Sequence, residues 1–144
     1  LIIITNNLRV SMARREELTN RIILPGGELR LPARDILGDE GLEFFSRYRA
    51  EFGIFGVAGV AEDGSLLEFH AAEVKVREQI RSNSLKSFLV LDHSKFGRLA
   101  PAVGENILDV DTIILDQIPD EKYKELIETI KDKLILTEID DYGA

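Results

Sequence analysis

Residues 88–98 read Phe88-Leu89-Val90-Leu91-Asp92-His93-Ser94-Lys95-Phe96-Gly97-Arg98. The first four are apolar, which predicts a buried strand over 88–91. Ligands of α/β folds bind at the carboxyl ends of such strands. Asp92 can accept hydrogen bonds from hydroxyl groups, with Ser94 beside it, and Lys95 can hold a phosphate. The stretch therefore predicts a site for a phosphorylated sugar or polyol; the alternative is a turn with a surface ion pair.

Strand and helix signals alternate along the rest of the chain. Apolar runs predict strands over 1–5, 21–24, 29–31, 52–60, 112–115 and 134–137. Amphipathic spacing predicts helices over 8–18, 39–48, 71–82 and 119–131. This alternation predicts a three-layer α/β fold, with a mostly parallel sheet and helices on both faces. A length of 144 residues fits one domain.

Composition limits the partners of the chain. The 18 basic and 26 acidic residues give a net charge of −8, which repels nucleic acid, so we expect no DNA binding by this chain itself. There is no cysteine, and His70 and His93 lack a metal-ligand spacing, so we expect no metal and no cofactor. No apolar run approaches the length of a membrane span, so we expect no membrane partner. The lack of cysteine fits a cytoplasmic location.

Two turn segments near the start of the chain are further candidates for the ligand site. Thr5, Asn6 and Asn7 end the first predicted strand, and their side chains and N–H groups can hold an anion; the alternative is helix capping. Gly26 and Gly27 can let a ligand approach the backbone closely, or they form a tight turn.

Three more candidates lie further along the chain. Gly59 and Gly64 bracket a loop that can close over a site; a plain hairpin explains them equally well. Lys75 can face the pocket from the predicted helix over 71–82, or it can simply face solvent. We expect Asp109, Asp111 and Asp116 to cap loops or bind water rather than hold a metal ion.

Five motifs in one order carry a family resemblance. They are Thr5-Asn6-Asn7-Leu8, Ile22-Ile23-Leu24-Pro25-Gly26-Gly27-Glu28-Leu29-Arg30, Phe52-Gly53-Ile54-Phe55-Gly56-Val57-Ala58-Gly59, Asp63-Gly64-Ser65-Leu66-Leu67-Glu68-Phe69 and Asp92-His93-Ser94-Lys95-Phe96-Gly97-Arg98. Together they resemble the C-terminal effector-sensing domain of the DeoR family of bacterial transcription regulators. The stretch over 63–69 and the lysine motif are most similar to members that respond to glycerol 3-phosphate.

The resemblance implies a fold shared with sugar-phosphate isomerases and coenzyme A transferases. It also implies that the chain is a sensor, not an enzyme. A phosphorylated polyol or sugar, glycerol 3-phosphate first, would bind at the residues above and lower operator affinity. DNA would be bound through an N-terminal winged helix-turn-helix, and the regulator would be a homo-oligomer. By the same resemblance, residues 1–144 form the sensor domain without its first βα unit and without the DNA-binding domain.

Two positions depart from the family pattern, and two other functions stay open. Ala61 and His70 stand where members often carry an acid. Asp92 and Lys95 also suit a sugar-phosphate isomerase, in which a carboxylate base acts beside a phosphate-binding lysine. The third reading is a dimerisation module without a ligand, with aromatic residues such as Phe44 and Phe52 at its interface.

Overall fold

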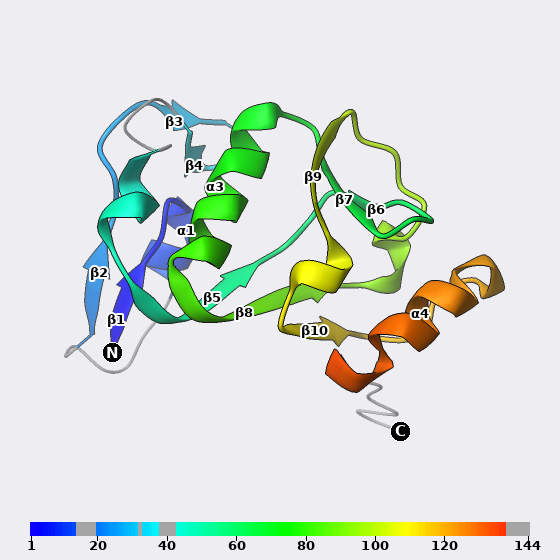
Figure 1. Cartoon of the computed structure of the whole chain (residues 1–144). Helices are drawn as coiled ribbons and strands as arrows, with labels where there is room; N and C mark the ends of the chain where they lie inside the picture. The colour runs from blue at the N-terminus through cyan, green and yellow to red at the C-terminus, as the bar shows by residue number, and fades with distance from the viewer. Residues whose placement is uncertain (14–19, 32, 38–42, 138–144) are drawn as a thin grey trace, which may run out of the picture. The chain divides into compact units, whose positions relative to one another are not determined.

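The computed structural model describes residues 1–13, 20–31, 33–37 and 43–137 (Figure 1). The chain forms two compact units, Leu1–Tyr48 and Arg49–Ala144. Among the described residues, no helix is long and apolar enough to cross a membrane.

The first unit contains short elements. They are β1 (Ile2–Ile4), α1 (Leu8–Met12), β2 (Arg21–Ile23), β3 (Leu29–Arg30), β4 (Asp35–Ile36) and the 3₁₀ helix η1 (Phe45–Arg47). Strand β1 pairs with β2 in parallel, and β3 pairs with β4 in antiparallel fashion. These pairings confirm the strands predicted in this part of the sequence. The helix predicted over 8–18 is too long, because α1 ends at Met12 and Ala13 is already non-helical. In the helix predicted over 39–48, Phe45–Arg47 form a 3₁₀ helix and Tyr48 is extended, while residues 39–42 lie outside the described residues.

The second unit is built on a four-stranded parallel sheet in the order β11-β10-β8-β5. Its elements are β5 (Ala50–Phe55), β6 (Gly59–Val60), β7 (Ser65–Glu68), α3 (Ala71–Ser82), β8 (Ser84–Leu91), η2 (His93–Lys95), β9 (Ala102–Asn106), η3 (Ile107–Asp109), β10 (Thr112–Leu115), η4 (Glu121–Tyr123), α4 (Lys124–Ile130), η5 (Lys131–Lys133) and β11 (Leu134–Leu136). The predicted α/β class and its mostly parallel sheet are confirmed.

The core of this unit lies against one face of the parallel sheet. Leu89 of β8 and Ile113 of β10 are neighbours in register and are fully buried. Ile130 of α4 belongs to the same cluster, and Ile80 of α3 packs against it. Side chains of successive strand residues point to opposite faces, and Val90, between the buried Leu89 and Leu91, is accordingly 44% exposed. Burial on this one face fixes the register in which the strand ends meet.

A second, antiparallel sheet was missed by the sequence patterns. Strands β6, β7 and β9 form it, in that order (Figure 1). The single strand predicted over 52–60 is wrong, because β5 ends at Phe55 and β6 belongs to this other sheet. Strand β9 was not predicted, because its sequence, Ala-Val-Gly-Glu-Asn, has no alternation of apolar and polar residues. Helix α4 also begins later than predicted, at Lys124, after the 3₁₀ turn η4.

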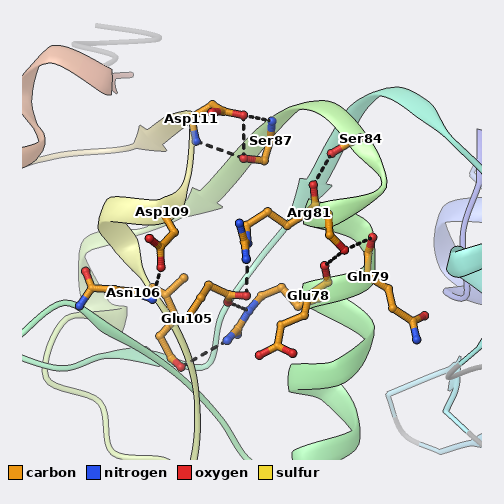
Figure 2. A network of polar contacts seen from close by, with 12 residues as sticks. Glu78, Gln79, Arg81, Ser84, Ser87, Glu105, Asn106, Asp109 and Asp111 are labelled. Carbon is orange, nitrogen blue, oxygen red and sulfur yellow. Dashed lines mark hydrogen bonds and ion pairs between the residues drawn. The ribbon is translucent and has the colours of Figure 1, made fainter.

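A buried ionic network joins α3 to the antiparallel sheet. Arg77 of α3 donates from Nη1 to Glu68 Oε1 and from Nε to Glu105 Oε1, each at 2.6 Å. Arg81, one turn further on, lies with Nε 3.6 Å from Glu105 Oε2 (Figure 2). Burial raises the pKa of Glu68 to about 7, because desolvation outweighs the attraction of Arg77. Gly104 is required here, since a Cβ at that position would overlap the Arg77 guanidinium.

Candidate functional site

An open pocket of about 420 Å³ lies at the carboxyl edge of the parallel sheet. Its lining comes from the ends of β5, β8, β10 and β11: Gly56, Val57, Val90, Leu91, Asp92, Lys95, Ile114, Asp116 and Thr137. This volume is within the range of small-molecule sites. The location is the one predicted for ligands of α/β folds, and it contains two of the predicted site residues, Asp92 and Lys95.

Asp92 is held rigidly by the residues that follow it. Its Oδ1 atom accepts a hydrogen bond from the Ser94 backbone N–H at 2.8 Å, and another from the Ser94 hydroxyl. The Ser94 hydroxyl and then the Ser94 N–H lower the pKa of Asp92, so its carboxylate is ionised at neutral pH. Ser94, also a predicted site residue, therefore orients Asp92. Ligand binding by Ser94 itself stays a prediction.

Lys95 shares the pocket with Asp92 and is anchored by its neighbours. Its Nζ lies 3.7 Å from Asp92 Oδ2, which is an ion pair but too long for a hydrogen bond. The next residue, Phe96, is buried against the Tyr123 ring, with 5.3 Å between the ring centroids. Phe96 also forms a β-bridge with Val60 of β6. The backbone that carries Lys95 is therefore held in place, and the ammonium group has N–H donors left for an anion.

Asp116 is the pocket residue that the sequence patterns assigned to another role. Its Oδ1 accepts hydrogen bonds from the backbone N–H groups of His93 at 2.7 Å and Gln117 at 2.8 Å. His93 Nδ1 lies 2.8 Å from Asp116 Oδ2. Burial raises the pKa of Asp116, but the hydrogen bonds from the side chain and backbone of His93 and from Gln117 lower it by more. The expected capping role is thus observed, but Asp116 lines the pocket as well.

The sequence carried a signal for Asp116. It follows the apolar run over 112–115 directly, just as Asp92 follows the run over 88–91. Parallel strands end at the same edge of a sheet, so this spacing places both acids together.

The other three predicted site residues of this unit have local explanations. Gly59 is buried where a Cβ would overlap the Arg98 carbonyl oxygen, and Gly64 has φ +89° in the turn between β6 and β7. Lys75 is exposed on α3, and it does not line the pocket that the described residues form. Their roles in ligand binding stay predictions.

In the first unit, the polar turn after β1 is satisfied by its own structure. Asn7 caps α1 by accepting from the Val10 N–H at 3.1 Å, and Asn6 donates to the Ile36 carbonyl at 3.2 Å. Thr5 Oγ1 accepts from the Asn7 N–H at 3.1 Å. The capping alternative is thus observed for Asn7. Gly27, next to Gly26, has φ +131°, as a glycine turn requires. Ligand binding by these residues stays a prediction.

The site is suited to binding an organic anion with hydroxyl groups. It offers one ammonium and two oriented carboxylates at the rim of an apolar pocket. Within the described residues, no group of three or more potential ligands is arranged to hold a metal ion. The fold and the site together define an α/β small-molecule-binding domain.

Comparison with known families makes the class more specific. Residues 1–117 match the family described as the DeoR C terminal sensor domain, and the chain belongs to this family.

Among the relatives, the glycerol-3-phosphate regulon repressor of Escherichia coli (strain K12) is 45% identical over 117 residues, which are 81% of this chain and 46% of that repressor. The protein of the same name from Haemophilus influenzae is 36% identical over 134 residues, 93% of this chain and 52% of its own length. The deoxyribose operon repressor of Escherichia coli (strain K12) is 26% identical over 129 residues, 90% of this chain and 51% of that repressor. The chain spans about half the length of these relatives.

Proposed function

We propose that the chain is the effector-sensing part of a bacterial transcriptional repressor, and that its effector is a phosphorylated polyol or sugar, with glycerol 3-phosphate as the first candidate. The observation that carries the proposal is the convergence of Asp92 and Lys95 on one pocket at the carboxyl edge of the sheet. The names of two of the relatives, which are glycerol-3-phosphate regulon repressors, support this choice of effector.

The two residues have different roles in this proposal. Lys95 holds the phosphate as a compact point charge, and Asp92 accepts a hydrogen bond from a hydroxyl group. Both acids of the pocket, Asp92 and Asp116, have a lowered pKa, which makes them weak bases. An isomerase needs a base with a pKa near the working pH. The site is therefore better suited to binding than to proton transfer.

Effector binding regulates DNA binding through a coupling free energy. The effector favours a conformation of the full-length repressor with low operator affinity, and DNA must weaken effector binding by the same factor. A net charge of −8 disfavours direct contact between this chain and DNA. As the family resemblance implies, DNA is contacted through a winged helix-turn-helix outside this chain. The repressor acts as a homo-oligomer in the cytoplasm.

Calorimetric titration tests the effector and the role of Lys95. Glycerol 3-phosphate is compared with ribose 5-phosphate, fructose 6-phosphate and inorganic phosphate. We expect glycerol 3-phosphate to bind tightest, and Lys95→Met to weaken it by roughly 10- to 100-fold, the usual loss for a hydrogen bond to a charged group. Lys131→Met, an exposed lysine outside the pocket, is the matched control and should leave affinity unchanged.

Two results would contradict the proposal. Equal affinity of Lys95→Met and the unaltered protein would show that the phosphate is not held in this pocket. Conversion of ribose 5-phosphate into another pentose phosphate, followed by NMR, would favour the isomerase reading instead.

A further inference from the structure

The two acids of the pocket are built in the same way on neighbouring strands. Leu91 of β8 and Leu115 of β10 are partners in the parallel register, and Asp92 and Asp116 are the next residues. Both carboxylates line the pocket, and their side chains are 48% and 40% exposed. The sheet therefore presents two carboxylates, rather than one, to the same ligand.

Each carboxylate has one oxygen fixed by the protein and one turned to other partners. In Asp92, Oδ1 accepts two hydrogen bonds from Ser94, and Oδ2 lies 3.7 Å from Lys95 Nζ. In Asp116, Oδ1 accepts from two backbone N–H groups, and Oδ2 lies 2.8 Å from His93 Nδ1. A carboxylate oxygen has about two lone pairs, so both Oδ2 atoms can accept a further hydrogen bond.

The charge balance of the pocket selects against a bare anion. Asp92 and Asp116 carry two negative charges, and Lys95 carries one positive charge. Two negative charges therefore face one positive charge, so a phosphate alone gains one attraction and two repulsions. A ligand that also offers two hydroxyl donors turns both carboxylates into hydrogen-bond partners.

We propose that Asp116 is a specificity-determining residue that accepts a second hydroxyl group of the effector, so that the pocket selects phosphorylated polyols over phosphate groups without hydroxyls. This inference rests on the proposed function. His93 is a positioning residue in it, because its backbone and ring hold Asp116 in place without contacting the effector. Glycerol 3-phosphate, with two free hydroxyl groups, has one donor for each carboxylate.

The test compares three ligands: glycerol 3-phosphate, which has two alcohol hydroxyl groups, propyl phosphate, which has none, and inorganic phosphate, which also lacks the carbon chain. Calorimetry gives the dissociation constants for the unaltered protein and for Asp116→Asn. We expect Asp116→Asn to weaken glycerol 3-phosphate about tenfold. The same variant should leave propyl phosphate unchanged or bind it more tightly, because a repulsive charge is gone. A loss of affinity confined to glycerol 3-phosphate separates hydroxyl recognition from a general loss of structure, which would weaken both ligands.

Two further variants complete the experiment. Asp132→Asn removes the same charge from an exposed position outside the pocket, and should leave the ratio of the affinity for glycerol 3-phosphate to that for propyl phosphate unchanged. Asp116→Asn should reduce this ratio. His93→Leu should also reduce it, but by a smaller factor, as expected of a residue that only positions Asp116.

The outcomes distinguish this inference from the proposed function. If Lys95→Met weakens binding as expected but Asp116→Asn changes the affinity for both phosphate esters by the same factor, or for neither, the role of Asp116 is refuted and the sensor function stands. If the unaltered protein binds no phosphorylated ligand, both are refuted.

Discussion

Replacement of Arg77 by methionine should strongly destabilise the second unit. The Arg77 side chain is 3% exposed, and its two carboxylate partners, Glu68 and Glu105, are 9% and 5% exposed. Arg77→Met keeps an unbranched apolar stem but removes the guanidinium. Two buried carboxylates are then left without their main partner.

The size of the effect follows from this geometry. Removal of one partner from a buried ion pair costs about 3–5 kcal/mol. Arg81 Nε lies 3.6 Å from Glu105 Oε2 and compensates one carboxylate in part, so we expect a loss of about 3 kcal/mol, the lower end of that range. With a urea m value of about 1–1.5 kcal/mol/M, the midpoint of unfolding should fall by about 2–3 M.

Urea unfolding followed by circular dichroism at pH 7 measures the loss. The control is Lys75→Met, an exposed cation on the same helix, which should change the free energy of unfolding by less than about 0.5 kcal/mol. Replacement of the whole network by apolar residues, in Arg77→Met with Glu68→Leu and Glu105→Leu, should restore at least half of the loss. If Arg77→Met lowers the free energy of unfolding no more than Lys75→Met does, the reasoning is refuted. That result would mean that the network is solvated, since its removal would then cost no more than the removal of a surface charge.

Two further predictions concern stability. Because the pKa of Glu68 is raised to about 7, the folded state binds more protons than the unfolded state between about pH 4.5 and 7, so the free energy of unfolding should fall by about 2–3 kcal/mol as the pH rises through this window. Glu68→Gln should flatten that slope in urea titrations at each pH, and an unchanged slope would assign it to another group. Gly59→Ala should lower the melting temperature, with a loss of about 1–3 kcal/mol, because the added Cβ overlaps the Arg98 carbonyl oxygen. Gly56→Ala is the matched control, since its Cβ meets only Val90 O at an ordinary 3.6 Å; equal effects of the two would contradict the argument.

The parallel sheet and two of the residues that line its pocket, Asp92 and Lys95, follow from local sequence patterns. The apolar runs over 88–91 and 112–115 are long enough to predict buried strands, and the polar residues after the first run predict Asp92 and Lys95 at the sheet edge. The same rule applied to the second run places Asp116 beside them. A single acid after a strand is also compatible with a cap, so the local pattern alone does not separate the two roles of Asp116.

Other features depend on partners that are distant in the sequence. Strand β9 has no apolar alternation of its own, and it is defined by its pairing with β7. Arg77 lies on an amphipathic helix, where a charged residue normally faces solvent. Its burial requires Glu68, nine residues away, and Glu105, 28 residues away. Propensity and periodicity contain no information about such pairs.

The β-bridge between Val60 and Phe96 has a mechanical consequence. The Gly97 N–H also donates to the Val60 carbonyl at 2.9 Å, so the segment that carries Lys95 is tied by its backbone to β6. A ligand that draws this segment inward must either break these bonds or pull β6 along, and β6 is paired in turn with β7. Because β9 is paired in turn with β7, the backbone hydrogen bonds of the antiparallel sheet would transmit a movement at the pocket from β6 to β9.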